Sequence, residues 1–385
     1  MSKTKILAFS VGRSDFDRYF PILEELRKIK KIDLKLALSQ IHSFNIFGKT
    51  INEVKKKKFK IIEHKKISKK KNFSEFFLPD EIIFLINIIK EYRPDIIIAL
   101  GDRYEMLAAP CAALTFNIPV IHIYGGAVTQ GAIDDLVRHS ISKLSSFHLV
   151  ATAKYKKRLI QLGEEKWRIK NIGVPELNYL KKIKKIPKNQ LNHILKIDIN
   201  KKTLLVNFHP VTTEINETKK YILNLLSAIK KSNLQVIFTY PNADKSNEII
   251  IKEIDKFIKR SKESKYIFIK NAGADLYSNL LRKCYAMVGN SSSGIVEAAS
   301  FKLPVINLGN RQKGKVFPAN VIQSSYKEQD ISKSIKKIAS HQYQKKLKKL
   351  INPYENKITK KQIASLIANL KIDNNLKIKK FKDIL

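Results

Sequence analysis

Short apolar runs alternate with longer amphipathic stretches along the first part of the chain. The runs are four to eight residues long and rich in Ile, Val and Leu, and apolar positions recur at helical spacing in the stretches between them. This alternation is typical of parallel strands joined by crossover helices. It predicts one doubly wound α/β domain. The predicted strands are 5–11, 33–38, 60–63, 95–100, 120–124 and 147–152, with helices at 21–29, 81–91 and 105–115.

The alternation pauses over residues 170–191, where Gly173, Pro175 and Pro187 interrupt a lysine-rich segment. Such punctuation is typical of a boundary between domains. A second series then predicts strands at 204–208, 235–240, 266–269, 286–288 and 305–308, and helices near 219–230, 248–258, 275–281 and 294–299. We predict a Rossmann-like domain at 1–175, another at 176–350, and a helical tail at 351–385 that could pack back on the first domain.

The predicted fold class is therefore α/β, with two Rossmann-like, doubly wound parallel-sheet domains facing across a cleft. A length of 385 residues suits two domains, because single cores rarely grow beyond about 250–300 residues. Ligands of open parallel sheets bind beyond the carboxyl ends of the strands. We therefore expect the functional residues in the loops that follow the predicted strands.

Composition narrows the class of protein. Hydrophobic residues make up 44% of the chain, enough for packed interiors, which excludes a mainly disordered protein. No apolar run reaches the roughly 20 residues of a membrane helix, and the apolar start is too short for a signal peptide. We expect a cytoplasmic protein with no membrane partner. Cys111 and Cys284 lie in apolar surroundings, which argues against a disulfide or a cysteine-rich zinc site.

The net charge of +40 could indicate a nucleic-acid partner. However, only 11 of the 74 basic residues are Arg, and the Lys residues are spread over the whole chain. The lysine runs also lack the aromatic or Arg neighbours that stack on bases. We therefore predict no nucleic-acid binding, while an attraction to anionic substrates remains compatible with this charge.

Glycine and arginine are concentrated just after the predicted strands. Most of the 13 glycines fall there, where a loop must bring its backbone close to another group. Four of the 11 arginines, Arg13, Arg103, Arg138 and Arg311, lie on these loops or in the helices that follow. A bidentate guanidinium favours recognition of phosphate or carboxylate. Salt bridges between the domains are the alternative.

Carboxylates follow two strands of the first domain. Asp102 comes directly after the strand at 95–100, where it could cap the next helix or act as a base. Asp134 and Asp135 follow a glycine-containing loop, and Arg138 and His139 lie one turn further on. The two aspartates could again be caps, but together with the Arg and His they could form an acid/base cluster.

The second domain offers a candidate anion site. His209 follows a strand and precedes Pro210, a position that suits pairing with a phosphate or proton transfer better than core packing. The segment Ser291, Ser292, Ser293, Gly294 joins a strand to a helix start, where N–H groups and hydroxyls can bind an anion. Glu297 is better placed for ribose hydroxyls. The lysine of a P-loop and the spacing of a dinucleotide fingerprint are missing, which argues against ATP hydrolysis and NAD binding.

Several motifs thus occur in order over about residues 4–315. They are Gly101-Asp102-Arg103, His122-Ile123-Tyr124-Gly125-Gly126, Ile133-Asp134-Asp135 with Arg138-His139, His209-Pro210-Val211-Thr212, Gly289-Asn290-Ser291-Ser292-Ser293-Gly294, and Asn307-Leu308-Gly309 with Arg311-Gln312. Together they closely resemble the hydrolysing UDP-N-acetylglucosamine 2-epimerases of bacterial sialic-acid synthesis and the epimerase half of the animal bifunctional enzyme.

The resemblance implies a glycosyltransferase-B-like fold, a homodimer or homotetramer, and a UDP-sugar substrate without cofactor or metal. In the family reaction UDP leaves as the C2 proton is removed, and water converts the resulting glycal to N-acetylmannosamine. Asp102 and Asp134 match two catalytic carboxylates, with Asp135 adjacent, and His209 matches a histidine beside the diphosphate. The other residues that the resemblance or their position makes candidates for substrate binding are Arg13, Arg103, Tyr124, Arg138, His139, Asn242, Ser291, Ser292, Ser293, Gly294, Glu297 and Arg311.

The sequence departs from the family at Tyr124, where the animal enzyme and some bacterial ones carry a catalytic Glu, and at Ala127, which replaces a frequent Glu. One acid/base role is therefore vacant or filled otherwise, with Tyr124, Asp135 or His139 as candidates. A related branch that acts on nucleotide-linked 2,4-diacetamido-2,4,6-trideoxyglucose, on the way to legionaminic acid, shares some of these motifs and gives an alternative substrate. A glycosyltransferase of the same fold and a polyanion-binding protein are alternatives of other classes.

Overall fold

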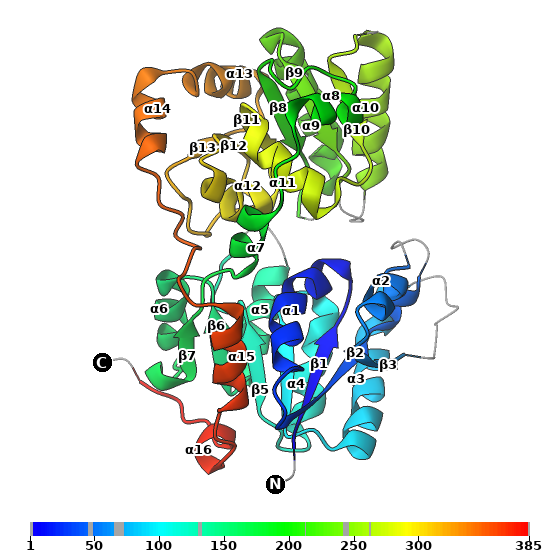
Figure 1. Ribbon diagram of the computed structural model, residues 1–385, viewed down its shortest axis with the longest axis vertical. Coiled ribbons are helices and arrows are strands. Elements are labelled where there is room, and N and C mark those ends of the chain that lie inside the picture. Colours follow the sequence, from blue (N-terminus) through cyan, green and yellow to red (C-terminus); the bar gives the residue numbers. More distant parts are fainter. Residues whose placement is uncertain are drawn as a thin grey trace. The chain divides into compact units, whose positions relative to one another are not determined.

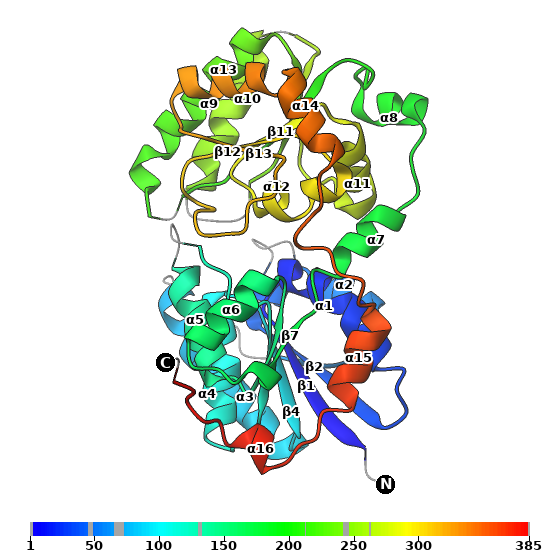
Figure 2. The same ribbon diagram turned by 90° about the vertical axis from the view of Figure 1, so that its left-hand side faces the viewer.

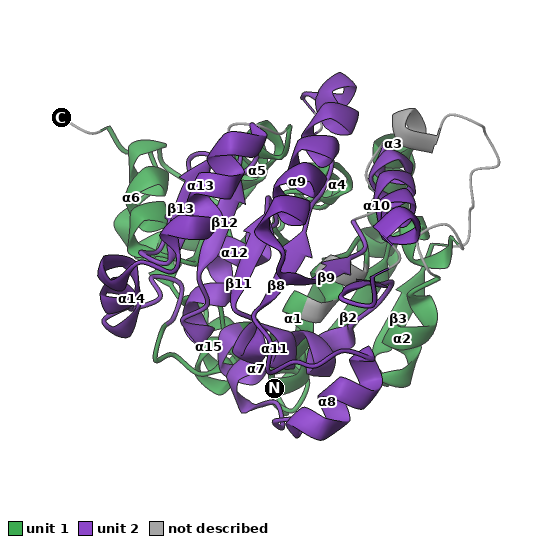
Figure 3. Ribbon diagram, turned by 90° about the horizontal axis from the view of Figure 1, so that it is seen from above, with its two compact units in different colours: residues 1–127, 133–176, 356–385 green, residues 128–132, 177–355 purple. Residues whose placement is uncertain are grey.

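The computed structural model describes residues 3–44, 49–64, 73–129, 133–211, 213–241, 246–261 and 263–383, with their side chains except those at positions 13, 14, 17 and 73–76. The chain forms two compact units, which Figure 3 shows in different colours. Unit 1 comprises residues 1–127, 133–176 and 356–385, and unit 2 comprises residues 128–132 and 177–355. The chain therefore leaves unit 1 after Glu176 and returns to it at Asn356.

Within its described residues, unit 1 contains a seven-stranded parallel sheet with the order β3-β2-β1-β4-β5-β6-β7 (Figure 1). Every residue of β4 is buried, as expected for a parallel strand with helices on both faces. The strands are β1 (Thr4–Ser10), β2 (Ile32–Leu38), β3 (Lys60–Glu63), β4 (Ile96–Leu100), β5 (Val120–Ile123), β6 (Phe147–Val150) and β7 (Ile169–Asn171).

The helices of unit 1 come from both ends of the chain. Helix α15 packs against α1, although more than 300 residues of sequence separate them (Figure 2). The helices are α1 (Arg13–Leu26), α2 (Ile51–Lys56), α3 (Phe73–Tyr92), α4 (Ala108–Leu114), α5 (Asp134–Leu144), α6 (Ala153–Gln161), α15 (Lys360–Ala368) and α16 (Asn374–Lys377). The short 3-10 helices are η1 (Gln40–Ser43), η3 (Tyr104–Leu107) and η4 (Lys166–Arg168).

The described residues of unit 2 form a six-stranded parallel sheet with the order β10-β9-β8-β11-β12-β13. Its strands are β8 (Thr203–Asn207), β9 (Gln235–Thr239), β10 (Tyr266–Ile269), β11 (Ala286–Gly289), β12 (Val305–Leu308) and β13 (Val321–Ser324). The helices that follow Glu176 are α7 (Glu176–Lys182), α8 (Lys188–Leu195), α9 (Thr218–Ser232), α10 (Asn247–Ser261), α11 (Gly273–Lys283), α12 (Ser292–Val296), α13 (Glu328–Lys337) and α14 (His341–Lys348), with 3-10 helices η5 (Ile215–Glu217) and η6 (Ala298–Phe301).

Alternate residues of the unit 2 strands fill two separate cores. Leu204 and Val206 of β8 belong to one apolar cluster, whereas Leu205 between them belongs to the other. In the same way, Ile237 of β9 and Met287 of β11 belong to the second cluster, whereas the residues before and after each of them belong to the first. Successive side chains of a strand point to opposite faces of the sheet. Both faces are therefore covered, which explains why the strands are continuous apolar runs in the sequence.

The structure confirms the predicted α/β fold class and each predicted strand, with small differences at the ends. Two edge strands escaped prediction: β7, which lies in the segment assigned to the domain boundary, and β13. Both are short and end in polar residues, Ile-Lys-Asn in β7 and Val-Ile-Gln-Ser in β13, so neither shows as an apolar run. The prediction of the first helix was wrong at its start. Helix α1 begins at Arg13 and contains Pro21 in its interior, where proline is normally disfavoured.

Candidate active site

Strands β1, β4 and β5 are parallel neighbours in the sheet of unit 1, so their carboxyl ends lie at the same edge of the sheet. The register pairs Leu100 with Ile123, and the Gly101 amide donates to Ile123 O at 2.9 Å. The loop that carries Asp102 therefore begins beside the loop that carries Tyr124. This edge is where ligands of open parallel sheets bind.

Arg138 joins two of the predicted carboxylates and is itself only 2% exposed. Its guanidinium forms an ion pair with Asp102, and Nη1 donates to Asp135 Oδ1 (3.2 Å) and to Ala127 O (3.1 Å). Burial alone would lower the pKa of Arg138, but the carboxylates, with Asp102 foremost, outweigh it and raise that pKa above its ordinary value. The guanidinium is thus a fixed cation between the two carboxylates. We use the name carboxylate cluster for Asp102, Asp134, Asp135, Arg138 and His139.

The structure decides between the cap and the cluster alternatives for these aspartates. The N-cap of η3 is Arg103, and the N-cap of α5 is Ile133, and neither helix start has a side-chain cap hydrogen bond in the described residues. Asp134 and Asp135 instead occupy the first turn of α5, where carboxylates interact favourably with the helix dipole. Asp102 and Asp135 pair with a cation, and the negative charge of Asp134 also acts on that cation.

His139 is the member of the carboxylate cluster that carries a neutral ring. Its Nε2 is 3.8 Å from Asp135 Oδ1, and among the described residues its buried Nδ1 has no hydrogen-bond partner. Burial lowers the pKa of His139, and this effect outweighs the nearby Asp135 carboxylate, which would raise it. A neutral imidazole can accept a proton, so His139 retains acid/base capacity.

Tyr124 forms a pair with a carboxylate that the sequence analysis did not single out. Its backbone has φ +71°, a conformation that non-glycine residues rarely adopt, and its side chain is buried. The phenol donates to Glu176 Oε2 at 2.6 Å. Burial, together with Glu176, raises the pKa of Tyr124 well above its ordinary value. A carboxylate is therefore bonded directly to the side chain that replaces the family Glu.

A further buried acid was missed near the loop of Asp102. Asp15 lies in the first turn of α1, and burial raises its pKa to about 6; Arg103 opposes this shift and Asp102 adds to it. His42 is also buried, with Nε2 3.1 Å from Ser10 Oγ, and burial and Arg103 lower its pKa to about 4. Asp15 stands two residues after Arg13, which is the signal that could have identified it.

Some predicted site residues are placed only in part. Arg13 is the first residue of α1, but its side chain is not among those described. Asn242 lies outside the described residues. Arg103 is half-exposed, with Nε and Nη2 each 3.4 Å from a carboxylate oxygen of Glu105. Their proposed contacts with substrate stay predictions.

In unit 2, Asn290 organises the predicted anion site. Its Oδ1 accepts from His209 N and its Nδ2 donates to His209 O, both at 2.8 Å, which ties the ends of β8 and β11 together. Its own carbonyl accepts from Arg311 Nη1 (3.2 Å) and Gln312 Nε2 (2.9 Å). Asn290 is part of the motif at 289–294, but the sequence analysis did not predict it as a site residue. Its role depends on partners that are distant in sequence.

The turn before Asn290 requires glycine. Gly289 has φ +147°, and a Cβ there would lie 2.0 Å from Asn207 O. That distance is far inside van der Waals contact, so the two backbones approach each other only because position 289 has no side chain. The close approach places Asn290 where its amide reaches both strand ends.

His209 is a neutral histidine in this site. It is buried, and burial together with the Arg311 guanidinium lowers its pKa to about 3. Near pH 7 it can donate one N–H bond to a phosphate oxygen, but it adds no positive charge. The positive charge beside it comes from Arg311, whose position Asn290 O supports.

The helix that follows is shorter than expected. Helix α12 has five residues, with Ser291 as its N-cap, Ser292 as its first residue, and η6 directly after it, so its dipole is small. Gly294 packs on Val305 of β12, where a Cβ would lie 3.0 Å from a methyl carbon. Backbone N–H groups and hydroxyls, rather than a long helix, are thus the available anion donors.

Two of the predicted polar groups here already bind each other. Ser293 Oγ donates to Glu297 Oε2 at 2.5 Å and is also 2.5 Å from the Tyr277 hydroxyl. Ser293 is therefore committed to the protein's own network, and Glu297 keeps one carboxylate oxygen for other partners. Burial raises the pKa of Tyr277 above its ordinary value in this environment, so the phenol stays protonated.

Other features of the structure do not point to a second centre. Two hollows in unit 2 share Lys201 and Lys202, which precede β8, in their linings. The residues that line them include none of the predicted site residues. Among the described residues, no group of three or more His, Cys, Asp or Glu side chains could hold a metal ion. No described helix is long and apolar enough to span a membrane.

The fold defines a class, the two-unit α/β proteins of glycosyltransferase-B-like fold. The fold of this chain is similar to the crystal structure of UDP-GlcNAc 2-epimerase from Neisseria meningitidis bound to UDP-GlcNAc, with a TM-score of 0.79, 21% identity, and coverage of 94% of this chain and 98% of that one. This likeness concerns the fold alone.

Sequence comparisons identify the family. The family model for UDP-N-acetylglucosamine 2-epimerase matches residues 24–368. A GDP/UDP-N,N'-diacetylbacillosamine 2-epimerase (hydrolyzing) of Campylobacter jejuni is 35% identical over 89% of both chains. A UDP-N,N'-diacetylbacillosamine 2-epimerase (hydrolyzing) of Legionella pneumophila is 34% identical over 83% of this chain and 84% of its own. The chain belongs to the UDP-N-acetylglucosamine 2-epimerase family, as an enzyme of the hydrolysing nucleotide-sugar 2-epimerase kind.

Proposed function

We propose that the chain hydrolyses and 2-epimerises UDP- or GDP-linked N,N'-diacetylbacillosamine, the 2,4-diacetamido-2,4,6-trideoxyglucose of the sequence analysis. The products are the nucleoside diphosphate and the free sugar inverted at C2. Two relatives with this activity in their names, 35% and 34% identical over most of the chain, support this substrate. The observation that supports the reaction is the carboxylate cluster, where Arg138 holds Asp102 and Asp135.

The reaction has a physical difficulty at C2, because no adjacent carbonyl acidifies that C–H bond. A base must take the C2 proton while the C1–O bond breaks and the nucleoside diphosphate leaves with the electron pair, which forms a glycal. Water then adds its hydroxyl to C1, and a proton returns to C2 from the opposite face. Positive charge develops at C1 in both steps, so positioned carboxylates can stabilise it as well as move protons.

In this proposal the members of the carboxylate cluster have distinct roles. Asp102 and Asp134 move the protons at C1 and C2. Arg138 is almost fully buried and already has three bonded oxygens, so it orients the carboxylates instead of contacting the substrate as the sequence analysis expected. The fixed cation also holds Asp102 in one place, and a general base must lie within reach of the proton that it removes.

The Tyr124–Glu176 pair fills the acid/base role that the sequence left open. The two groups are 2.6 Å apart, so the phenol orients the Glu176 carboxylate by donating a hydrogen bond to it. The raised pKa of Tyr124 keeps the phenol protonated at neutral pH, so the carboxylate is the member of the pair that exchanges a proton with the substrate. Asp135 then supports Arg138 through their ion pair, and His139 lies next to Asp135 and supports that carboxylate.

Unit 2 binds the nucleoside diphosphate in this proposal. Arg311 supplies the positive charge, His209 donates a neutral N–H bond, and the start of α12 at Ser291 and Ser292 supplies backbone N–H groups. The remaining Glu297 oxygen accepts from the ribose. These contacts stabilise the leaving group most when the C1–O bond is breaking, and therefore lower the barrier to elimination.

UDP-N-acetylglucosamine is the second candidate substrate, and it was the first choice of the sequence analysis. The description of the family model that matches residues 24–368 names this substrate, which favours it. The two sugars differ at C4 and C6, where one has an acetamido group and a methyl group and the other has two hydroxyl-bearing carbons. A site that bonds a substrate hydroxyl rejects a sugar without it strongly, so the two rates will differ widely.

The decisive experiment incubates the protein in deuterated water with UDP-diacetylbacillosamine, GDP-diacetylbacillosamine or UDP-N-acetylglucosamine and follows the products by NMR. We expect the largest kcat/KM with a diacetylbacillosamine donor, and deuterium at C2 of the released sugar. Preference for UDP-N-acetylglucosamine would establish the second candidate. Turnover only after addition of a sugar acceptor would indicate a glycosyltransferase, and salt-sensitive polyanion binding without turnover would reject an enzyme of this kind.

A further inference from the structure

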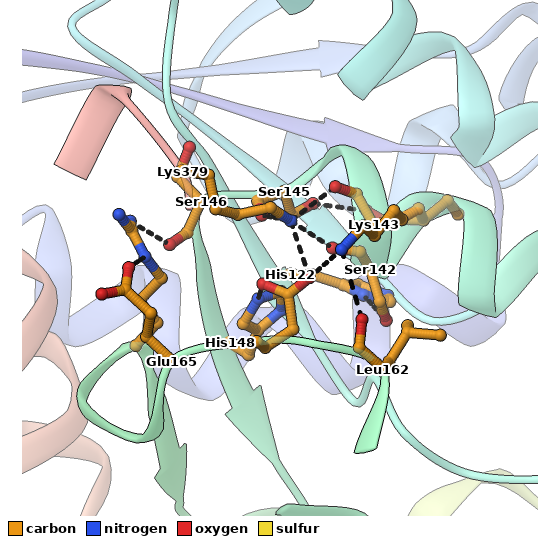
Figure 4. Close-up of polar contacts among 12 residues, drawn as sticks. His122, Ser142, Lys143, Ser145, Ser146, His148, Leu162, Glu165 and Lys379 are labelled. Carbon is orange, nitrogen blue, oxygen red and sulfur yellow. Dashed lines mark hydrogen bonds and ion pairs between the residues drawn. The ribbon is translucent and has the colours of Figure 1, made fainter. Parts of the chain in front are cut away.

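Helix α5 carries most of the carboxylate cluster at one end and is held at the other end by residues outside the cluster. Asp134 and Asp135 lie in its first turn, whereas Ser142 lies in its last turn. Ser142 is four residues after Arg138, so these two side chains share one face of the helix. Figure 4 shows the contacts around this second end.

Lys379, in the tail after α16, caps the C-terminal end of α5. Its ammonium donates to Lys143 O (2.5 Å), to Ser145 O (2.9 Å) and at 3.5 Å to Ser142 O (Figure 4). The last carbonyls of a helix have no partner within the helix and form the negative end of its dipole. One cation bonded to several of them therefore fixes α5 along its axis.

The ammonium of Lys379 is also balanced by a buried carboxylate. Glu164 Oε1 accepts from Lys379 at 2.8 Å, and Glu164 Oε2 is 3.0 Å from His148 Nε2, with the latter two side chains fully buried. Nearby, Arg168 donates to three carbonyls within the tail segment 375–378. Loss of Lys379 would leave the fully buried Glu164 with only the longer ion pair to Lys143 (3.5 Å) and the bond to His148, so these contacts together favour one position of the tail.

A second link joins α5 to the loop of Asp102. His122 is fully buried on β5, with Nε2 2.8 Å from Gly101 O and Nδ1 3.0 Å from Ser142 Oγ. A carbonyl oxygen only accepts, so Nε2 carries the ring proton and Nδ1 accepts from the Ser142 hydroxyl. Because Gly101 precedes Asp102, His122 connects the helix that bears Arg138 to the loop that bears its carboxylate partner.

This link is tightly packed and neutral. A Cβ at Gly125 would lie 2.7 Å from Ser142 Oγ and 2.9 Å from His122 Nδ1, so the backbone leaves no space for another arrangement. Burial lowers the pKa of His122 to about 3, although its bond to Gly101 O opposes the shift. The ring therefore transfers no proton near pH 7 and acts through its hydrogen bonds.

We propose that His122 and Lys379 are positioning residues for the reaction. Through Ser142 and the C-terminal end of α5 they fix the place of Arg138, and Arg138 in turn fixes the Asp102 carboxylate. This role rests on the proposed function, in which Asp102 acts on the sugar. Misplacement of a catalytic group by about 1 Å can cost about a hundredfold in rate. The C-terminal tail is thereby required for the chemistry of the carboxylate cluster.

The test compares Ser142→Ala and Lys379→Met with two controls in the full-length protein. Lys379→Arg keeps a cation that can bond carbonyls, and Lys377→Met removes an equal charge from an exposed position of the same tail. For each variant we would measure kcat, KM, the melting temperature, the kinetic isotope effect with substrate deuterated at C2, and the fraction of glycal released per UDP.

We expect kcat to fall about tenfold or more in Ser142→Ala and Lys379→Met with little change in KM, because leaving-group contacts are untouched. In both variants the isotope effect should rise if removal of the C2 proton becomes slower, and the glycal fraction should rise if return of a proton to C2 becomes slower. One of these steps slows in every molecule, because the carboxylate is misplaced. Lys379→Arg should recover most of the rate, and Lys377→Met should match the wild type.

A purely structural role predicts a different result. Loss of folded molecules lowers kcat but leaves the isotope effect and the glycal fraction at their wild-type values, because the surviving molecules are normal. That outcome, or a wild-type rate in Ser142→Ala and Lys379→Met, would overturn the positioning role alone. Absence of turnover by the wild type with all three sugar nucleotides would overturn the proposed function and this role with it.

Discussion

The candidate site of unit 1 and that of unit 2 are held in place by different kinds of interaction. In unit 1, charged side chains hold one another. Arg138 is bonded to Asp102 and Asp135, and the Lys379 ammonium donates to Lys143 O at the C-terminal end of α5. In unit 2, neutral amide groups and a glycine hold the site: Asn290 binds both backbone groups of His209, and Gly289 permits the close approach.

This difference matches the chemistry proposed for each unit. A group that moves protons needs a fixed position, which neighbouring charges provide in unit 1. A site for a leaving diphosphate needs donors that are already aligned and bring no competing carboxylate close to the phosphates, as the amides of unit 2 provide. The comparison suggests that charge changes will damage unit 1 most and backbone changes will damage unit 2 most.

The largest effect is expected from Asp102→Asn, which removes the charge at the centre of the carboxylate cluster. Release of UDP should fall by at least about a thousandfold, because a general base is lost and Arg138 is left with one carboxylate fewer. Calorimetric affinity for UDP should stay near the wild-type value. Asp95→Asn is the matched control, since Asp95 is exposed just before β4 begins; normal turnover in Asp102→Asn would reject its catalytic role.

Gly289→Ala tests the backbone dependence of unit 2. The new Cβ would meet Asn207 O at 2.0 Å in a conformation that disfavours side chains, so we expect a loss of about 3 kcal/mol or more in unfolding free energy. Urea denaturation measures this loss, and the UDP-induced rise in melting temperature should shrink.

Gly273→Ala separates the clash from the conformational strain in that experiment. Gly273 has φ +60° with open space around it, so its substitution should cost only about 1 kcal/mol. Equal losses in the two variants would show that contact with the Asn207 backbone is not what makes Gly289 necessary.

A smaller effect is expected from Tyr124→Phe, which removes the donor of this hydrogen bond, and from Glu176→Gln, which keeps an acceptor oxygen but removes the charge and the proton capacity of the carboxylate. Each should lower kcat about tenfold to a hundredfold with little change in KM, because proton transfer is impaired while substrate contacts remain. The double variant should lose no more than either single one, since the two groups act as a unit. Additive losses, measured by steady-state kinetics, would show that they act separately.

The smallest effects concern the pH dependence of stability, and the two units should differ in sign. Asp15 has a folded-state pKa raised from 3.8 to about 6 by burial, so the folded protein binds this proton more tightly and the stability it contributes is lost as pH rises from about 4 to 6. His209 has a folded-state pKa lowered from 6.5 to about 3, so its contribution is lost as pH falls below about 6.5.

Substitution should remove each of these slopes. As pH rises from 4 to 6, the wild type should lose free energy of unfolding through Asp15, and Asp15→Asn should not. As pH falls from 6.5 towards 3, the wild type should lose free energy of unfolding through His209, and His209→Gln should not. Urea unfolding at several pH values measures both differences. Parallel curves for wild type and variant would show that the group has the same pKa in the folded and unfolded states.

The sequence alone determined the series of strands and helices and the loops that carry the site. Apolar runs such as 96–100 are local features, and the residues that follow them lie at one edge of the sheet whatever the rest of the chain does. Asp102, Asp134, Asp135 and His209 could therefore be predicted as candidate site residues without a structure. The family resemblance added the reaction, which the sequence comparisons support.

Only the tertiary structure decided which groups bind each other, because the partners are distant in sequence. Asp102 pairs with Arg138, 36 residues away, instead of capping a helix, and Lys379 reaches Lys143 across 236 residues. Burial, which also depends on the whole fold, makes His209 a neutral donor and brings Asp15 and Glu176 into the site region. Local sequence patterns determine where a side chain starts, whereas packing determines its partners and therefore its charge.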